Sequence, residues 1–491
     1  MSTIRFGTDG WRGVIARDFT FESVARVAQA LALYLKSPQR ATLDLYKRWG
    51  VPCRPPERGV VIGYDTRFLS REFAIHLGRV LQDAEIPVWI AQEAVPTPAL
   101  SFAVQTHQAA LGVMVTASHN PPEYNGVKVK VEYASSAPPS VTRLIEQLIP
   151  AEAPTVKSPE SALNFADLKS PYLQRLRELI DRKTLEASPL VVVVDAMYGA
   201  GRGYIAQILK DLGVESLTVR HGDNPRFGGK NPEPIEKNLS PLRAVIASER
   251  QKRARSAKFL MGVVTDGDAD RVAAMDELGH LIDSHRCFAL ILKHLLLARR
   301  WRGKVVKSFT LSDMAEVLAV KHDLALEEVP VGFKHICEKM VREDVLIGGE
   351  ESGGFAIKHH IPERDGILNA LLLCEIAARA QRPMSEIVDD LLAEVGPHWY
   401  DRRDLHLENR LEIVERVKQR PPREIAGLEV MKTEMLDGVK LRFARGWLLL
   451  RASGTEPLLR LYCEADSPTR VREVLDEAER FARGDLGLWG R

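Results

Sequence analysis

The chain has 491 residues, which at roughly 100 to 200 residues per domain predicts about three or four domains. Hydrophobic residues make up 45% of it and charged residues 27%, an ordinary composition for a folded protein, so disorder should not dominate. Lys plus Arg number 68 against 66 for Asp plus Glu, so no global positive field favours nucleic acid or an anionic membrane. We therefore expect neither as a partner, and any anion must bind at a local site.

The N-terminal segment MSTIRFGTDG has no apolar targeting core, and the longest apolar runs are too short to cross a bilayer. The five cysteines are far apart and form no C-x-x-C pair. Such spacing favours a reducing compartment and argues against a thiolate zinc site. We therefore expect a cytoplasmic protein without a membrane partner.

Short β-branched runs alternate with helical patterns along the chain. The run GVVIGY (59–64) precedes a helix predicted from about Ser70, and LGVMVT runs directly into Ser118. Further on, LVVVVD (190–195) leads through a glycine-rich turn into the helical segment YIAQILKDL. This alternation predicts an α/β protein built on parallel sheets with crossover helices.

The segment PAEAPTVKSPESA (150–162) is rich in Pro, Ser and Ala and lacks periodicity, which predicts a linker. Further boundaries are predicted near Asp283 and Pro397. The last part combines strand-like VKLRFARGWLLLRASG with a closing helix, the pattern of a small α+β module. The predicted domains are three α/β domains at 1–150, 163–283 and 284–396, and an α+β domain at 397–491.

The segment TASHNP (116–121) places Ser118 and His119 at the end of an apolar strand, among turn-forming residues. A hydroxyl beside an imidazole suggests a nucleophile and its base, but adjacent side chains need not face each other. No G-x-S-x-G elbow is present, which disfavours an α/β-hydrolase. From these residues alone, a ligand-facing serine and a serine that only caps a turn both remain open.

The segment TDGDADR (265–271) crowds Asp266, Asp268 and Asp270 behind an apolar run. Three carboxylates so close together repel one another unless a hard cation neutralises them. An EF-hand is disfavoured because Arg271 stands where the loop needs glycine, and because the following residues look like a strand. Mg²⁺ that shares a substrate or phosphoryl oxygen fits better than a solvated acidic turn.

Two glycine-containing segments further along could bind a polar ligand. In GGEESGGF (348–355), Glu350, Glu351 and Ser352 could accept from and donate to sugar hydroxyls, although an exposed turn is an equal alternative. In RASGTEP (451–457), a guanidinium, two hydroxyls and free backbone N–H groups suit a phosphate. The sequence GAGRG lacks dinucleotide-binding spacing, and there is no P-loop motif.

Five segments in this order, FGTDGWRG, TASHNPPEYNGVKV, TDGDADR, GGEESGGF and RASGTEP, resemble the α-D-phosphohexomutase superfamily. The resemblance spans residues 5 to 457. It implies a heart-shaped molecule of four domains around a central cleft, with three related α/β domains and a smaller α+β C-terminal domain. It also implies an intramolecular phosphotransferase of the isomerase class.

The resemblance further implies a role for individual residues. Ser118 would carry the phosphoryl group as phosphoserine. The three aspartates would bind Mg²⁺, and an oxygen of the phosphoserine would complete that metal site. Other catalytic positions implied are Arg12 and Arg271 beside the phosphoryl group, Lys128 in proton transfer at the sugar hydroxyl, and His119 as a support of the loop. Positions implied for substrate binding are Glu350 and Ser352 for the sugar, Lys334 for a contact with the substrate, and Arg451, Ser453, Gly454 and Thr455 for the non-reacting phosphate.

The expected reaction exchanges a 1-phosphate for a 6-phosphate through a 1,6-bisphosphate, and glucose 1,6-bisphosphate should also act as activator. The form GEESGG, with Gly354 where other members often have histidine, resembles phosphoglucomutases, as do VGFKHI (331–336) and NPRFGGKNPEP (224–234). We therefore expect glucose, with phosphomannomutase or dual activity next. Phosphoglucosamine mutase, a sugar bisphosphate synthase or phosphatase, and a non-catalytic sensor remain alternatives. The partner would be a phosphorylated hexose, bound by a monomer or homodimer.

Overall fold

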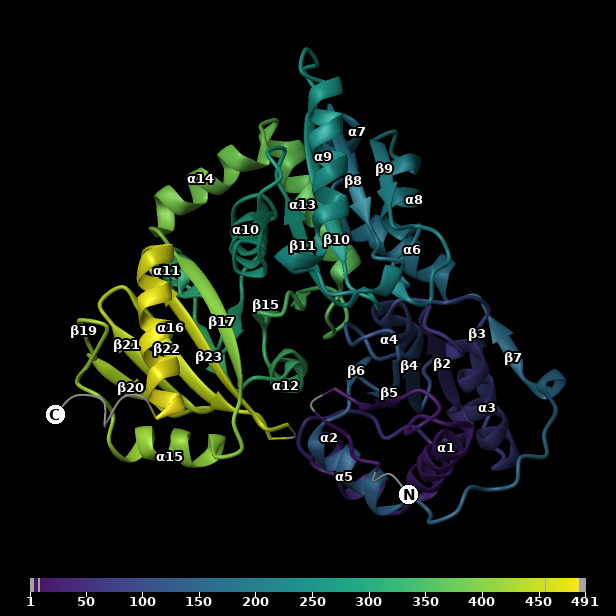
Figure 1. The fold of residues 1–491 in the computed structure, drawn as a ribbon. Helices are drawn as coiled ribbons and strands as arrows, with labels where there is room; N and C mark the ends of the chain where they lie inside the picture. The colour runs from purple at the N-terminus through teal and green to yellow at the C-terminus, as the bar shows by residue number, and fades with distance from the viewer. Residues whose placement is uncertain (1–3, 8, 455, 485–491) are drawn as a thin grey trace.

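The computed structural model describes residues 4–7, 9–454 and 456–484, which form four units arranged around a common centre (Figure 1). Three units are mixed sheets covered by helices, and the fourth is an antiparallel sheet with two helices. This confirms the predicted fold class. Among the residues described, each helix is too short or too polar to span a bilayer. Of the five cysteines, only Cys53 is exposed.

The first sheet has seven strands, and its central strands β4, β2 and β3 run parallel as predicted. The helix predicted from Ser70 begins at that residue. The strands in sheet order are β1 (Trp11–Val14), β5 (Tyr124–Val131), β4 (Leu111–Val115), β2 (Val60–Tyr64), β3 (Val88–Ala91) and β7 (Asn164–Ala166), with β6 (Ser135–Ser136) paired to β5. The helices are α1 (Phe21–Lys36), α2 (Asp44–Lys47), α3 (Ser70–Asp83), α4 (Thr97–Thr106) and α5 (Pro139–Gln147). Strand β7 pairs with β3, so the first sheet includes residues 164–166, just past the predicted start of the second domain at 163. The predicted domain bounds remain a prediction.

The second sheet has five strands, in the order β12 (Leu281–Ile282), β11 (Val272–Met275), β10 (Phe259–Thr265), β8 (Leu190–Asp195) and β9 (Glu215–Val219). Its helices are α6 (Lys169–Leu179), α7 (Arg182–Glu186), α8 (Tyr204–Asp211) and α9 (Ser240–Lys252). Strands β8 and β10 are parallel and consist largely of buried apolar residues, as expected for a strand covered on both faces. Strand β11 is the strand predicted to follow Arg271.

The third sheet has four strands, in the order β14 (Leu326–Val329), β13 (Lys304–Ser308), β15 (Val345–Gly349) and β16 (Phe355–Ile357). The helices that follow the second sheet are α10 (Ser284–Leu297), α11 (Met314–Lys321), α12 (Phe333–Arg342), α13 (Gly366–Ala380) and α14 (Met384–Val395). Helix α13 packs against β10 and β11 of the second sheet as well as against α10. One continuous apolar core therefore runs through the first three units.

The fourth unit is an antiparallel sheet in the order β17 (Trp399–His406), β23 (Leu458–Ala465), β22 (Gly446–Ala452), β21 (Val439–Phe443) and β20 (Lys432–Glu434). It also contains α15 (Arg410–Gln419), the hairpin β18 (Glu424–Ile425) and β19 (Leu428–Glu429), and α16 (Pro468–Arg483). Helix α16 packs along β23 and β17. This unit has an apolar core of its own, which matches the predicted small α+β module.

Candidate active site

Each of the four segments singled out in the sequence begins at the end of a strand. The serine loop (116–121) follows β4, the aspartate loop (265–271) follows β10, the glutamate loop (348–355) follows β15, and the arginine loop (451–457) follows β22. Strand ends are where α/β sheets present side chains to a ligand. The fold therefore places these loops where a shared site requires them.

Ser118 lies buried in the serine loop with a left-handed backbone, at φ 53°. Its N–H donates to Thr116 Oγ1 at 2.9 Å, and its hydroxyl donates to Asp266 Oδ2 at 2.9 Å. His119 Nδ1 is further away, at 3.4 Å from Ser118 Oγ. A strained backbone at a buried polar residue is typical of functional sites. The hydroxyl is oriented toward the aspartate loop rather than held by a histidine base.

His119 is partly buried, with several cations nearby. Burial lowers the pKa of its imidazole well below the usual value, and Arg271, Arg12 and Lys128 lower it further. The imidazole is therefore neutral near pH 7 and binds a proton only weakly. This environment fits the predicted supporting role better than that of a general base.

Arg67, just after β2, was not expected from the sequence. Its guanidinium donates to the backbone carbonyls of Ser118, Asn120 and Pro121 at 2.7 Å each and to that of Tyr124 at 2.9 Å. The side chain also forms a buried ion pair with Asp65, at 3.2 Å. Five donors in a planar fork can satisfy several carbonyls at once, so this one arginine fixes the conformation of the serine loop.

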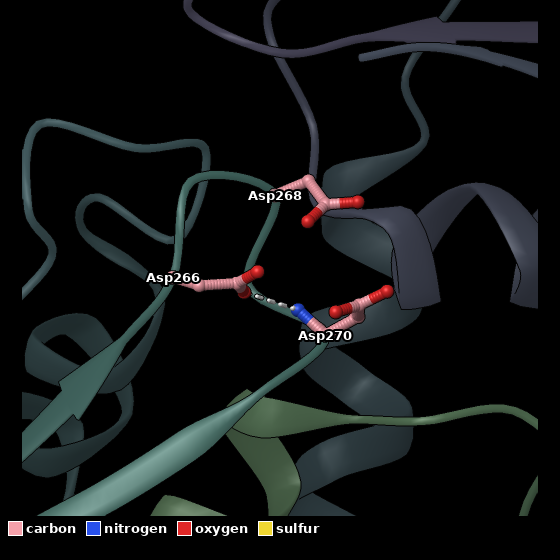
Figure 2. Close-up of side chains that lie close together, drawn as sticks. All are labelled: Asp266, Asp268 and Asp270. Atoms are coloured by element: carbon pink, nitrogen blue, oxygen red, sulfur yellow. Dashed lines mark hydrogen bonds between the residues drawn. The ribbon is translucent and has the colours of Figure 1, made fainter. Parts of the chain in front are cut away.

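Asp266, Asp268 and Asp270 turn their carboxylates toward a common space, and Figure 2 shows the hydrogen bond from the Asp270 N–H to Asp266 Oδ1, at 3.1 Å. One oxygen from each lies within 4.8 Å of the others. Asp268 Oδ1 and Asp270 Oδ1 are buried without a hydrogen-bond partner. Burial and the two neighbouring carboxylates raise the pKa of Asp266 well above its usual value. Unpartnered buried oxygens that repel one another suit a hard divalent cation, so the donor set fits Mg²⁺.

The aspartate loop also packs directly on the serine loop. A Cβ added at Gly267 would lie 2.4 Å from the carbonyl oxygen of Ser118, so only glycine permits this approach. Thr97, at the start of α4, donates its N–H to the carbonyl oxygen of Asp268 at 2.9 Å and its hydroxyl to the carboxylate of that residue. The first and second units thus hold the two loops together.

Lys128 on β5 connects the aspartate loop to the N-terminal segment. Its Nζ lies 2.8 Å from Asp268 Oδ2, 2.9 Å from Asp270 Oδ2 and 2.9 Å from Asp9 Oδ2. Burial alone would lower the pKa of Lys128, but the three carboxylates outweigh it and raise the pKa. Lys128 is therefore protonated at neutral pH and donates hydrogen bonds to Asp268 and Asp270.

The two predicted arginines flank the serine loop. Arg12 on β1 donates from Nη1 to the side-chain oxygen of Asn120. Arg271 Nε lies 4.0 Å from Asp266 Oδ2 and 3.9 Å from Asp270 Oδ1, and this nitrogen is buried without a hydrogen-bond partner. A guanidinium with an unused buried donor, close to the carboxylate that accepts from Ser118, suits an anion such as a phosphoryl group.

Arg364, another residue that sequence analysis missed, joins three segments. Its Nη2 lies 2.8 Å from Asp270 Oδ2 and also pairs with Asp9, while Nη1 lies 3.6 Å from Glu350 Oε2. The guanidinium lies 5.3 Å from the centroid of the Phe333 ring. This cation therefore links the N-terminal segment and the aspartate loop to the glutamate loop.

In the glutamate loop, Glu350 accepts a hydrogen bond from the Gly332 N–H at 2.9 Å. Burial raises the pKa of Glu350 to about 7, although Arg364 opposes the shift. Ser352 Oγ is buried without a hydrogen-bond partner. A carboxylate and a hydroxyl with unused bonding capacity suit sugar hydroxyls.

The arginine loop meets the third unit through one aspartate. Asp437 Oδ2 accepts from Arg451 Nε at 2.9 Å and from the Val331 N–H at 3.0 Å. Ser453 is buried, Gly454 is exposed, and Thr455 lies outside the described residues. Arg451 is thereby tied to the segment that carries Lys334.

Lys334 is half-buried, and burial lowers the pKa of its ammonium, as do Arg143 and Arg451. It lines a cavity of about 180 Å³, together with Asp9 and Arg143. Since Asp9 also contacts Lys128 and Arg364, the cavity adjoins the charged network around the aspartate loop. Lys334 is thus positioned between this network and Arg451.

The domain models of the phosphoglucomutase/phosphomannomutase family match the chain in order. Alpha/beta/alpha domains I, II and III match residues 3–155, 170–279 and 283–395, and the C-terminal domain matches residues 412–480. The chain belongs to this family. The predictions of a phosphohexomutase and of an isomerase-class phosphotransferase are therefore confirmed. The family is magnesium-dependent, and the aspartate loop fits that ion.

Similar proteins cover nearly the whole chain. A phosphoglucomutase/phosphomannomutase of Thermococcus kodakarensis is 30% identical over 96% of each chain. A phosphoglucosamine mutase of Methanococcus vannielii is 28% identical over 85% of this chain and 90% of its own. A solved structure from Thermus thermophilus, named as a phosphomannomutase, is 36% identical with a TM-score of 0.84, over 98% of this chain and all of the other. The names agree on phosphorylated sugars and differ in the sugar.

Proposed function

We propose that this protein interconverts glucose 1-phosphate and glucose 6-phosphate through a phosphoserine at Ser118 and a glucose 1,6-bisphosphate intermediate. The observation that carries the proposal is the bond from Ser118 Oγ to Asp266, at 2.9 Å, beside buried carboxylate oxygens without partners. A nucleophilic oxygen at a fitted cation site is what phosphoryl transfer needs. A protein that only bound the sugar would need neither.

In the forward half-reaction, the bond between phosphorus and Ser118 Oγ breaks as a bond to a sugar oxygen forms. The proton that the sugar hydroxyl loses balances the proton that the freed Ser118 Oγ takes up, and the return transfer reverses both changes. Arg12 and Arg271 would neutralise the charge on the phosphoryl oxygens. Mg²⁺ held by the three aspartates would supply further charge neutralisation. Lys128, held protonated by its carboxylate partners, would hydrogen-bond the reacting sugar oxygen and assist the movement of its proton.

Two ends of the substrate must be held for the exchange to occur. Glu350 and Ser352 would bind hydroxyls of the sugar, and Lys334, Arg451, Ser453, Gly454 and Thr455 would hold the non-reacting end and its phosphate. The intermediate must then turn round, so the same groups have to accept the sugar in both orientations.

Glucose is favoured by the GEESGG form of the glutamate loop and by VGFKHI, which resemble phosphoglucomutases. The relatives named for mannose or glucosamine phosphates make those sugars the principal alternatives. A single side chain can decide recognition of one hydroxyl.

The test is a rate comparison with purified protein, Mg²⁺ and a trace of glucose 1,6-bisphosphate. Turnover of glucose 1-phosphate should exceed that of the mannose and glucosamine 1-phosphates, and a chelator should abolish it. Ser118→Ala should lose both turnover and phosphorylation, measured by intact mass. Faster turnover of another sugar would overturn glucose, and net release of inorganic phosphate would indicate a phosphatase.

A further inference from the structure

Gly354 has no side chain, and Arg364 occupies the space that one would need. A Cβ added at Gly354 would lie 2.2 Å from Cδ and 2.8 Å from Cγ of Arg364. The backbone gives no reason for glycine here, because Gly354, unlike Gly353, is not among the residues with positive φ. The glycine is therefore required by the stem of Arg364 and not by the conformation of the loop.

The head of Arg364 is fixed as tightly as its stem. The side chain is only 4% exposed, and its guanidinium touches carboxylates from three segments, namely Asp9, Asp270 and Glu350. On the remaining side it faces the ring of Phe333. A planar guanidinium held in this way has one orientation, which lysine could not reproduce.

We propose that Arg364 is a positioning residue of the mutase reaction, which holds the sugar-binding carboxylate Glu350 in a fixed relation to the aspartate loop, and that Gly354 leaves the room this requires. The inference rests on the proposed function, since it assigns Glu350 to the sugar. Phosphoryl transfer depends on alignment between sugar oxygen and phosphorus, and Glu350 and Asp270 follow strands of different sheets. Arg364 is the side chain that connects them.

The same contact influences the charge of Glu350. The groups that face this carboxylate are Arg364, Glu351, Arg271, the Gly332 N–H and Lys334. Arg364 forms an ion pair with Glu350, at 3.6 Å. Without it, Glu350 would become protonated at a higher pH, and the acid limb of the KM profile would move to higher pH.

The kinetic test compares Arg364→Met and Arg364→Lys with the wild type in the full chain with Mg²⁺, on the sugar 1-phosphate that the wild type converts fastest. Arg364→Met should raise KM by up to about tenfold, the rise expected for Glu350→Gln, and should shift the acid limb of KM upward in pH. Arg364→Lys keeps the charge and should recover part of KM and the pH profile. The matched control is Arg40→Met, which removes an equally buried arginine paired with Glu132 in the first unit. It should lower Tm and leave KM unchanged.

A double-mutant cycle tests the pairing with Gly354 directly. Gly354→Ala alone should raise KM as strongly as Arg364→Ala does, because the new methyl group displaces the arginine. In the Arg364→Ala background, Gly354→Ala should add less than about a twofold effect, since the clash is gone.

The outcomes separate this inference from the proposed function. If the wild type is active, multiplicative effects of Gly354→Ala and Arg364→Ala on KM would overturn the positioning role alone. An Arg364→Met form with a lower Tm but an unchanged KM and pH profile would do the same. A wild type that converts no sugar phosphate overturns the proposed function and this inference together. If Arg364→Met does not fold, Arg364→Lys and the cycle with alanine decide in the same way.

Discussion

At the scale of single residues, two adjacent carboxylates of the glutamate loop have different surroundings. Glu350 is buried, with Arg364 at 3.6 Å and the Gly332 N–H at 2.9 Å. Glu351 instead accepts hydrogen bonds from the hydroxyls of Thr310 and Ser308. Only Glu350 is therefore connected to the network of Asp9 and Asp270, and identical side chains in one loop should make different contributions to binding.

The first prediction concerns the pH dependence of sugar binding. Burial raises the pKa of Glu350 to about 7, so the carboxylate takes up a proton as pH falls through that value and loses capacity to accept from sugar hydroxyls. KM should therefore rise on the acid side. Glu350→Gln should raise KM about tenfold and flatten its dependence on pH.

Glu351→Gln is the matched control and should keep the pH dependence of the wild type. Because a phosphate monoester also titrates near about pH 6, the quantity to compare is the difference between each variant and the wild type. A Glu350→Gln enzyme with the unaltered wild-type profile would contradict this assignment.

At the scale of elements, the serine loop depends on a residue from a different strand. Arg67 follows β2, and its donors meet four carbonyls between Ser118 and Tyr124. Phe227, in the segment 224–234, lies 5.0 Å from this guanidinium. The Gly267 N–H donates to the carbonyl oxygen of Pro232 in the same segment, at 3.1 Å. The segment thus covers both the arginine and the aspartate loop.

The second prediction is that Arg67→Met reduces kcat more than it changes KM. Loss of the four bonds should let Ser118 move, and a displacement of about 1 Å can cost roughly 100-fold in rate. The change also leaves Asp65 buried without its ion pair, which should cost about 3 to 5 kcal/mol of unfolding free energy. Denaturant unfolding and steady-state kinetics measure the two effects. Arg71→Met, at an exposed position of α3, is the control and should change neither kcat nor the free energy of unfolding. An unchanged kcat for Arg67→Met would refute the role of Arg67 in fixing the serine loop.

Sequence patterns could predict the loops but not the residues that fix them. Apolar strands followed by turn formers were enough to place Ser118 and Asp266 at strand ends, since that signal is local. Arg67 and Arg364 were missed because their partners are remote: Arg67 and Ser118 are 51 residues apart, and Arg364 and Asp9 are 355 residues apart. No periodicity encodes a pairing of that separation, and an isolated arginine in a sequence is usually a surface residue.

At the scale of the whole molecule, the chain has two principal bodies. The first three units share one apolar core, whereas the fourth unit has its own, built from strands β17 and β21 to β23 with α15 and α16. Figure 1 shows the fourth unit, in yellow, beside the third unit and apart from the second. The arginine loop of the fourth unit can therefore complete the candidate active site only if the fourth unit docks on the third in one fixed orientation.

That contact contains a buried network of opposite charges. Lys440 on β21 lies 3.0 Å from Glu328 and 3.9 Å from the centroid of the Phe309 ring. Lys307 on β13 pairs with Asp313 and Glu328, at 3.1 Å each. Burial lowers the pKa of Lys440 to about 8, so this lysine is charged at neutral pH and begins to lose its proton in mild alkali. Buried ion pairs of this kind favour one docking geometry over others.

The third prediction concerns Asp437, which connects the two bodies close to Lys334 and Arg451, the residues proposed to bind the substrate. It binds Arg451 of the fourth unit and the N–H of Val331, three residues before Lys334 in the third. Asp437→Asn keeps the shape but removes the charge, so Arg451 should lose its fixed orientation, and KM should rise about five- to tenfold with kcat nearly constant. Asp401→Asn, at an exposed position of β17, is the control and should leave KM unchanged. Phosphorylation of Ser118, measured by intact mass, should be the same in both variants because the serine loop belongs to the other body. If Asp437→Asn instead lowered kcat at constant KM, the aspartate would act on the transfer step and not on the capture of the substrate.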